Sequence, residues 1–206
     1  MKIGETKMIE IYYKNLGGVW FGVACKNGEI LATWFAQSQK KTQNGLLSEL
    51  PPDEPVQVAD NPSSLEEDTV ASLKKVYDGE NVASSFPFAY SLLPTYTQKV
   101  LKATLQIPFG YVTTYGALAE AVGGGARAVG NVMASNRFAP IVPCHRVVKS
   151  DFTLGGYGGG LRLKVELLTR EKKGFSNSRY VQIEGRNLKV FPAEFVLDKL
   201  PRPLPF

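Results

Sequence analysis

The residues best suited to chemistry are a cysteine and a histidine that stand side by side, in the segment Ile141-Val142-Pro143-Cys144-His145-Arg146-Val147-Val148. The chain has two cysteines and one histidine, so the pair joins its only imidazole to one of its two thiols. A thiol attacks as the thiolate, and an imidazole within reach can accept its proton. The pair therefore indicates nucleophilic chemistry at Cys144 with His145 as the base.

Both residues also have an ordinary structural interpretation. Cys144 can be a core thiol, because free cysteine is among the most buried residue types, and His145 can be held by backbone groups in a turn. Neighbours on an extended chain point to opposite sides, so contact between them requires a turn, which Pro143 favours, or a bridging water. Orientation of the imidazole requires a carboxylate, and Glu171 is one of several candidates on sequence alone.

Length and composition indicate a globular protein. The chain has 206 residues, of which 44% are hydrophobic and 21% charged, enough for one large domain or two small ones. No apolar run approaches the roughly 18 residues of a membrane span, and residues 1–7 lack the apolar core of a signal peptide. We therefore expect a cytoplasmic protein with no membrane partner, whose net charge of +5 is compatible with nucleic acid.

The cysteine and histidine counts argue against a metal site. Two cysteines and one histidine do not supply the four ligands of a usual zinc site. A Cys25–Cys144 disulfide is formally open, but a reducing cytosol disfavours it and it would block the nucleophile. Cys25 falls on the apolar face of a predicted strand, so we interpret it as a core thiol.

The first ninety residues predict a small α/β domain made of a β-ribbon and a helix. Strands are expected over 9–13, 19–26 and 29–35, with Asn27-Gly28 as a type I′ hairpin turn. Residues 44–62 are predicted to form a loop, with a short strand at 56–58. The capping-box pattern Ser64-Leu65-Glu66-Glu67 opens a helix that Gly79 ends. No residue pattern in this part of the sequence indicates a catalytic site.

Three short helices are predicted next, over 95–106, 115–122 and 126–135. Thr95 and Thr114 are the expected caps, and glycines 123–125 separate the last two helices. This arrangement is typical of a helix-turn-helix, although a plain helical packing unit gives the same pattern. The third helix carries small residues and one charge, Arg127, which suits close approach to a DNA groove without discrimination between bases.

The remaining residues predict a strand at 147–149, a helix over 161–172 and a strand pair at 180–184 and 187–191. Three segments in this half resemble the O6-alkylguanine-DNA alkyltransferase (methylated-DNA–protein-cysteine methyltransferase) family: Ala126-Arg127-Ala128-Val129-Gly130, Pro143-Cys144-His145-Arg146 and Gly155-Gly156-Tyr157-Gly158-Gly159-Gly160. The resemblance covers roughly residues 86–172, and a weaker resemblance extends to the N-terminal hairpin and helix.

The resemblance implies a fold of class α/β plus α. Residues 1–90 would form a small N-terminal α/β domain, a ribonuclease H-like β-ribbon with a helix. Residues 91–173 would form a helix-turn-helix domain, winged-helix-like, for DNA binding and alkyl transfer. Residues 174–206 are an extension beyond the usual family end, and we assign them no role.

The resemblance also implies DNA repair by a monomer. An alkylated guanine is flipped out of double-stranded DNA, and its alkyl group moves to a cysteine once and irreversibly, with no cofactor and no metal. O4-methylthymine is expected as a minor substrate. Multiple turnovers on an ester or amide would instead favour a cysteine hydrolase that uses Cys144, His145 and Glu171.

Site residues follow from the matching motifs. Cys144 becomes the alkyl acceptor, His145 the base acting through a water, and Glu171 the group that orients it. Asn136 would form a hinge behind the third helix, and Tyr115 would push the 3′ phosphate and donate a proton to the leaving guanine. The implied DNA contacts are Arg127, which enters the duplex, with Tyr115, Thr97, Ala126 and Ser150, and the implied pocket residues are Met133, Val147, Tyr157 and Gly158.

One departure bears on substrate range. Many relatives have serine where this chain has Gly158, and the smaller residue predicts a wider pocket that admits O6 groups such as benzyl. Two further functions stay open besides the hydrolase. A lesion-binding relative without transfer activity would lack the acceptor cysteine, and a helix-turn-helix regulator would bind one sequence tightly.

Overall fold

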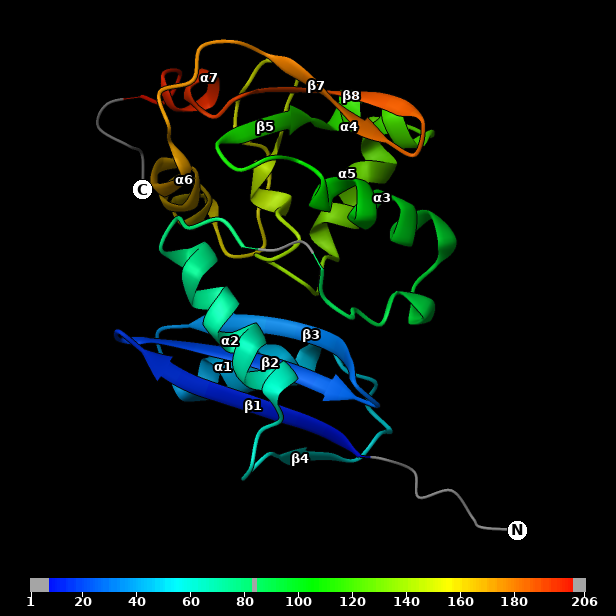
Figure 1. Cartoon of the computed structure of the whole chain (residues 1–206), viewed down its shortest axis with the longest axis vertical. Helices are drawn as coiled ribbons and strands as arrows, with labels where there is room; N and C mark the ends of the chain where they lie inside the picture. The colour runs from blue at the N-terminus through cyan, green and yellow to red at the C-terminus, as the bar shows by residue number, and fades with distance from the viewer. Residues whose placement is uncertain (1–7, 83–84, 202–206) are drawn as a thin grey trace. The chain divides into compact units, whose positions relative to one another are not determined.

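The computed structural model describes residues 8–82 and 85–201, which fall into two compact units (Figure 1). The first unit contains the described residues up to Lys75 with 85–90 and 137–139, and the second contains the rest. Residues 1–7, tested above for a signal peptide, and the last five residues of the extension lie outside the described part. The division into domains 1–90, 91–173 and 174–206 stays a prediction.

A four-stranded sheet forms the centre of the first unit, in the order β3–β2–β1–β4. Strands β1 (Ile9–Leu16), β2 (Val19–Lys26) and β3 (Glu29–Ala36) are antiparallel, and β4 (Val56–Val58) runs parallel to β1. The predicted strands and hairpin are confirmed. Asn27 and Gly28 have φ angles of 53° and 76°, as a type I′ turn requires.

Helix α1 (Gln39–Ser48) occupies residues that we had assigned in part to a loop. The prediction was wrong because Asn44 and Gly45 are poor helix formers, whereas tertiary packing stabilises this helix. Leu46 is fully buried against the sheet. A Cβ atom on Gly45 would lie 2.2 Å from the Trp34 ring, so the glycine permits the close approach of α1 to β3.

Helix α2 (Ser64–Tyr77) begins where the sequence indicated, but its cap lies one residue earlier. Ser63 donates its backbone N–H and its hydroxyl to Glu66 Oε2, at 2.7 and 3.0 Å. The predicted Ser64–Glu67 pairing is wrong because Glu66, only 1% exposed, is the acidic residue that turns inward. In Figure 1, α1 lies behind the sheet and α2 in front of it.

The second unit contains the three predicted helices, α3 (Thr95–Leu105), α4 (Tyr115–Val122) and α5 (Ala126–Ala134), which pack against one another. Thr114 caps α4 as predicted, since its hydroxyl accepts the Ala117 N–H at 3.1 Å. The expected cap at Thr95 is wrong. Pro94 holds that position, and the Gln98 side chain donates to Leu93 O instead. Within the described ranges, no helix is long and apolar enough to cross a membrane.

A second four-stranded sheet has the order β6–β5–β8–β7. Its strands are β5 (Tyr111–Thr114), β6 (Val147–Val148), β7 (Arg179–Ile183) and β8 (Arg186–Pro192). The hairpin β7–β8 was predicted, although its turn is Glu184-Gly185 rather than Gly185-Arg186, and β5 was not. Because β8 pairs with β5, the extension after residue 173 is built into this unit. Helix α6 (Leu161–Glu171) and the short α7 (Glu194–Leu197) complete it.

Candidate active site

The turn expected at Cys144 is present as a short 3-10 helix, η2 (Cys144–Arg146). The Cys144 N–H donates to Val142 O at 2.8 Å, and the Arg146 N–H donates to Pro143 O at 2.9 Å. Cys144 lines a cavity, whereas the His145 side chain is completely buried. The turn thus puts the thiol at the cavity wall and the imidazole in the protein interior.

His145 and Arg146 both bind Glu171 at the end of α6. The distance from His145 Nε2 to Glu171 Oε1 is 2.8 Å. Arg146 donates from Nε to Oε2 and from Nη2 to Oε1, each at 2.9 Å, and its Nη1 donates to Ile107 O at 2.7 Å. Of the candidate partners for His145, the structure therefore selects Glu171, with a bidentate arginine beside it.

The protonation states of this cluster follow from burial and charge. Burial opposes ionisation of Glu171, but the charges and hydrogen bonds of His145 and Arg146 outweigh it and lower its pKa to about 2. Burial lowers the pKa of His145, against the attraction of Glu171. Since an ionised carboxylate only accepts, Nε2 of the neutral ring carries the hydrogen. Nδ1, buried and without a hydrogen-bond partner among the described residues, then offers a lone pair for a proton.

The thiol of Cys144 is held in its neutral form at rest. Burial raises its pKa, and a hydrogen bond from Asn136 and the positive charge of Lys164 work against that rise. Asn136 also donates Nδ2–H to Val142 O at 2.8 Å, so it bridges the end of α5 and the residues before η2. Attack by this thiol would therefore require a proton acceptor.

A cavity of about 680 Å³ gathers most of the predicted site residues. Its wall contains, from the prediction, Tyr115, Ala126, Arg127, Met133, Cys144, Tyr157 and Gly158, and in addition Gly130, Ala134, Lys149, Gly155 and Gly156. These residues come from the start of α4, from the whole length of α5, from η2 and from the segment between β6 and α6. Arg127 is exposed, while Cys144 is 6% exposed, so the cavity leads from the surface of α5 to the thiol.

Other predicted residues lie away from this cavity wall. Val147 lies fully buried in β6, where it pairs with Thr113, and is not part of the wall. Thr97 is half-buried on α3, and Ser150 is exposed in the turn after β6. Their expected contacts with DNA stay predictions.

Both tyrosines of the cavity are protonated at neutral pH. Burial raises the pKa of Tyr115, and the charge of Cys144 adds to the rise. The pKa of Tyr157 is raised well above its usual value by burial and by the charges of Cys144 and Glu171. Each phenol is therefore available as a proton donor.

Sequence reasoning missed two buried cations, Arg146 and Lys164. Lys164 Nζ donates to Val147 O at 2.7 Å, Leu154 O at 2.5 Å and Gly156 O at 3.2 Å. Burial lowers its pKa to about 8. The available signal was its spacing on α6, where Lys164 and Glu171 share a face with Leu168 and interrupt an otherwise apolar pattern.

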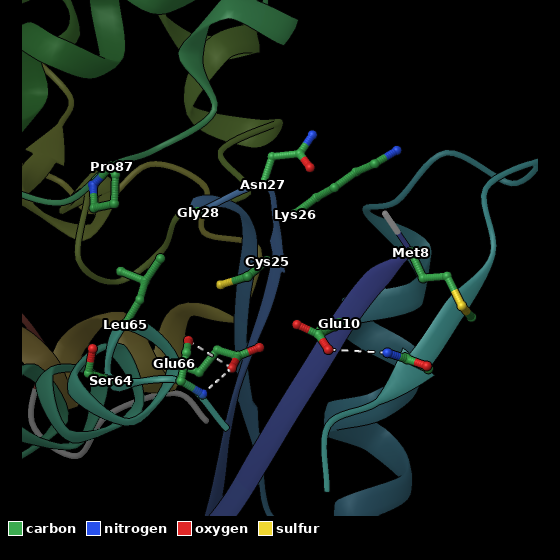
Figure 2. A pocket seen from close by; sticks show the side chains of 12 residues that line it. Met8, Glu10, Cys25, Lys26, Asn27, Gly28, Ser64, Leu65, Glu66 and Pro87 are labelled. Atoms are coloured by element: carbon green, nitrogen blue, oxygen red, sulfur yellow. Dashed lines mark hydrogen bonds between the residues drawn. The ribbon is translucent and has the colours of Figure 1, made fainter. Parts of the chain in front are cut away.

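The second thiol, Cys25, has a different environment in the first unit (Figure 2). It lines a cavity of about 840 Å³ between Glu10 on β1 and Glu66 on α2. Burial, then the charges of Glu66 and Glu10, raise its pKa to about 12. Such a thiol stays protonated and unreactive, and both cysteines are free. Cys144, which precedes His145 in the chain and lines the other cavity, remains the candidate nucleophile.

The candidate site is thus a buried group of Cys144, His145 and Glu171 below a cavity with an exposed arginine. Comparisons with known proteins identify the family. The profile of the family "6-O-methylguanine DNA methyltransferase, DNA binding domain" matches residues 95–173. A methylated-DNA–protein-cysteine methyltransferase of Pyrobaculum aerophilum is 56% identical over 73 residues, 35% of this chain and 49% of that protein. The chain thus spans about half the length of this curated relative.

Solved structures extend the likeness to most of the chain. The O6-methylguanine-DNA methyltransferase of Pyrococcus kodakaraensis is 30% identical, with a TM-score of 0.63 over 80% of this chain and 99% of that one. A Mycobacterium tuberculosis OGT, solved in complex with DNA, is 28% identical, with a TM-score of 0.61 over 79% and 92%. The chain belongs to the O6-methylguanine-DNA methyltransferase family.

Proposed function

We propose that this protein repairs double-stranded DNA by moving the alkyl group of O6-alkylguanine to Cys144, once per molecule, with O4-methylthymine as a minor substrate. The observation that carries the proposal is the neutral His145 held by Glu171 next to a thiol that lines the cavity. Membership of the family and the names of the relatives support the same activity. In this proposal Arg127, Ala126, Thr97, Ser150 and Tyr115 contact DNA, and Met133, Tyr157 and Gly158 line the alkyl pocket.

The proposed step balances without a cofactor. The Cys144 proton passes to His145 Nδ1 through a water, the sulfur forms a bond to the alkyl carbon, and the bond from that carbon to guanine O6 breaks. Tyr115 supplies a proton, so that guanine leaves neutral, and regains it from the imidazolium through solvent. The product is a thioether, which no group in the cavity can hydrolyse, and this accounts for a single turnover.

We also propose the finer fold and the setting. The first unit would be ribonuclease H-like and the second winged-helix-like, with 1–90 and 91–173 as domains and 174–206 as an extension. The mixed sheets and helices of both units support this assignment. A cytoplasmic, monomeric protein stays a prediction.

Intact-mass measurement tests the activity directly. After incubation with duplex DNA that carries one O6-methylguanine, we expect a gain of one methyl group, mapped to Cys144 and absent in Cys144→Ser. Tight lesion binding with no mass change would indicate a non-transferring recognition protein. Turnover of an ester would favour the hydrolase, and tight binding to one undamaged sequence the regulator.

The pH dependence of transfer should follow His145. Because burial lowers its pKa from the usual 6.5, the imidazole stays a proton acceptor at pH values where an exposed histidine is half charged. We expect the single-turnover rate constant with free O6-benzylguanine to hold at pH 6.5 and to fall only at lower pH, by about tenfold per pH unit at the limit. A decline that starts above pH 7 would contradict this role.

Replacing Gly158 with serine should narrow the alkyl pocket. A Cβ atom at Gly158 meets no atom within 4 Å, so the side chain is accommodated without strain. We expect Gly158→Ser to react about tenfold more slowly with O6-benzylguanine, the lower end for a change of one group in an apolar pocket, and at an unchanged rate with O6-methylguanine in DNA. Gly158→Ala should lie between the two. An equal benzyl rate in all three proteins would show that this position does not limit substrate size.

A further inference from the structure

The extension after residue 173 contacts the turn that leads into the wall of the cavity at Cys144. Lys199, just after α7, donates from Nζ to Asp151 O at 2.7 Å. The same ammonium group lies 5.3 Å from the centroid of the Phe152 ring, within the range of a cation–π interaction. One side chain of the extension therefore holds both the backbone and an aromatic ring of this turn.

Phe152 is itself packed among aromatic residues of the extension. Its ring lies 4.9 Å from that of Phe191 on β8 and 5.5 Å from that of Phe195 on α7, both edge-on. Its φ angle is 63°, a left-handed conformation that bulky residues rarely adopt. Such a conformation persists only where surrounding contacts hold it. The turn supplies some of them itself, such as the bond from Phe152 N–H to Lys149 O at 3.0 Å, and the extension supplies the aromatic packing.

The segment 149–157 forms a wall between two cavities. Lys149, Gly155, Gly156 and Tyr157 line both the cavity at Cys144 and a second one of about 600 Å³. The far side of the second cavity is formed by the extension, at Val196, Lys199, Leu200 and Pro201. The buried Lys164 side chain also donates hydrogen bonds to this loop, at Leu154 O and Gly156 O.

We propose that the extension fixes the position of the 149–157 loop, with Lys199 and Phe152 as positioning residues that set the rate and the alkyl range of the reaction at Cys144. This rests on the proposed function. Tyr157 belongs to this loop, and small displacements of groups around a reacting centre change rates strongly. A loop released from the extension moves more freely, so large O6 groups gain access while the methyl reaction loses alignment.

Lys199→Met tests the proposal, because it keeps the aliphatic stem and removes the ammonium group. We expect the rate constant with O6-methylguanine in duplex DNA to fall about 3- to 10-fold, the scale of one ordinary hydrogen bond, because the Lys199 bond is exposed to solvent. We also expect the benzyl-to-methyl rate ratio to rise. Lys199→Arg should restore both values. The matched control is Lys172→Met, which removes the same charge from an exposed site after α6 and should leave both values unchanged.

Single turnover separates positioning from folding. The end point counts folded protein, and the rate constant reports its reactivity. A lower end point with an unchanged rate constant would mean that Lys199 only stabilises the fold, and an unchanged rate constant with an unchanged end point would also overturn the proposal.

Hydrogen exchange tests whether the extension holds the 149–157 loop, even if the unmodified protein transfers no alkyl group. That last result would contradict only the proposed function. Amides of residues 149–157 should exchange faster in Lys199→Met than in the unmodified protein or in Lys172→Met. Equal exchange in all three proteins would show that Lys199 does not hold this loop.

Discussion

Replacing Glu171 with glutamine should lower the free energy of unfolding by about 3–5 kcal/mol, the usual cost of breaking a buried ion pair from one side. Glu171 is completely buried and accepts bonds from His145 and Arg146. An amide retains one acceptor oxygen and places an NH₂ group against a second donor. The Arg146 charge then stays buried without its counterion. Chemical denaturation of the two proteins measures the difference.

The same substitution should slow transfer in the protein that remains folded. If the glutamine NH₂ donates to His145 Nε2, the ring hydrogen moves to Nδ1, and the lone pair that accepts the thiol proton is lost. General-base assistance contributes about 10²–10⁴-fold, so we expect a loss in that range. Glu166→Gln, the same change on an exposed pair of α6 with Arg162, should cost less than about 1 kcal/mol and leave the rate unchanged.

Acid stability offers an independent check on this cluster. The folded-state pKa of Glu171 is about 2, against an ordinary value of 4.5. Its ionised form therefore stabilises the fold above about pH 4.5, and this contribution is lost as the pH falls toward 2. His145, whose pKa is lowered, adds a loss that begins below its usual 6.5. In Glu171→Gln the loss between about pH 4.5 and 2 should shrink, and an unchanged profile would contradict the assignment.

Replacing Arg127 with alanine should slow repair of duplex DNA by about 10²-fold while leaving the reaction with free O6-benzylguanine unchanged. Arg127 lies exposed at the start of α5 and on the rim of the cavity. Extrusion of a base costs a few kcal/mol, and a side chain that fills the vacated space offsets part of that cost. Because a free base requires no extrusion, the two substrates separate this function from chemistry at Cys144.

Two further variants sharpen the interpretation. Arg162→Ala, which removes one charge from an exposed position on α6, controls for general electrostatic attraction to DNA. Arg127→Lys keeps the charge but not the planar group, and should recover only part of the rate. An equal loss for Arg127→Ala on free base and duplex would mean that the residue shapes the pocket instead.

Much of the secondary structure was readable from local pattern. Asn27-Gly28 sets a hairpin, Thr114 caps a helix, and glycines 123–125 end it, because each of these acts through its immediate neighbours. Local pattern failed for α1 and β5. Gly45 argues against a helix until the Trp34 ring that needs its space is known. Tyr111–Thr114 becomes a strand through pairing with Val147 and with Phe191, which is far away in sequence.

The sequence by itself predicted the reacting group, Cys144 beside the only histidine, in a motif specific enough to indicate the family. Only the tertiary structure decided which carboxylate holds His145 and that Arg146 and Lys164 supply buried charge. It also placed Cys25, expected to be a core thiol, near two carboxylates that raise its pKa. The tertiary structure also showed that the extension packs against the loop at Phe152. These facts depend on burial and on contacts between residues distant in the chain, which change pKa values and fix geometry, and no local pattern encodes them.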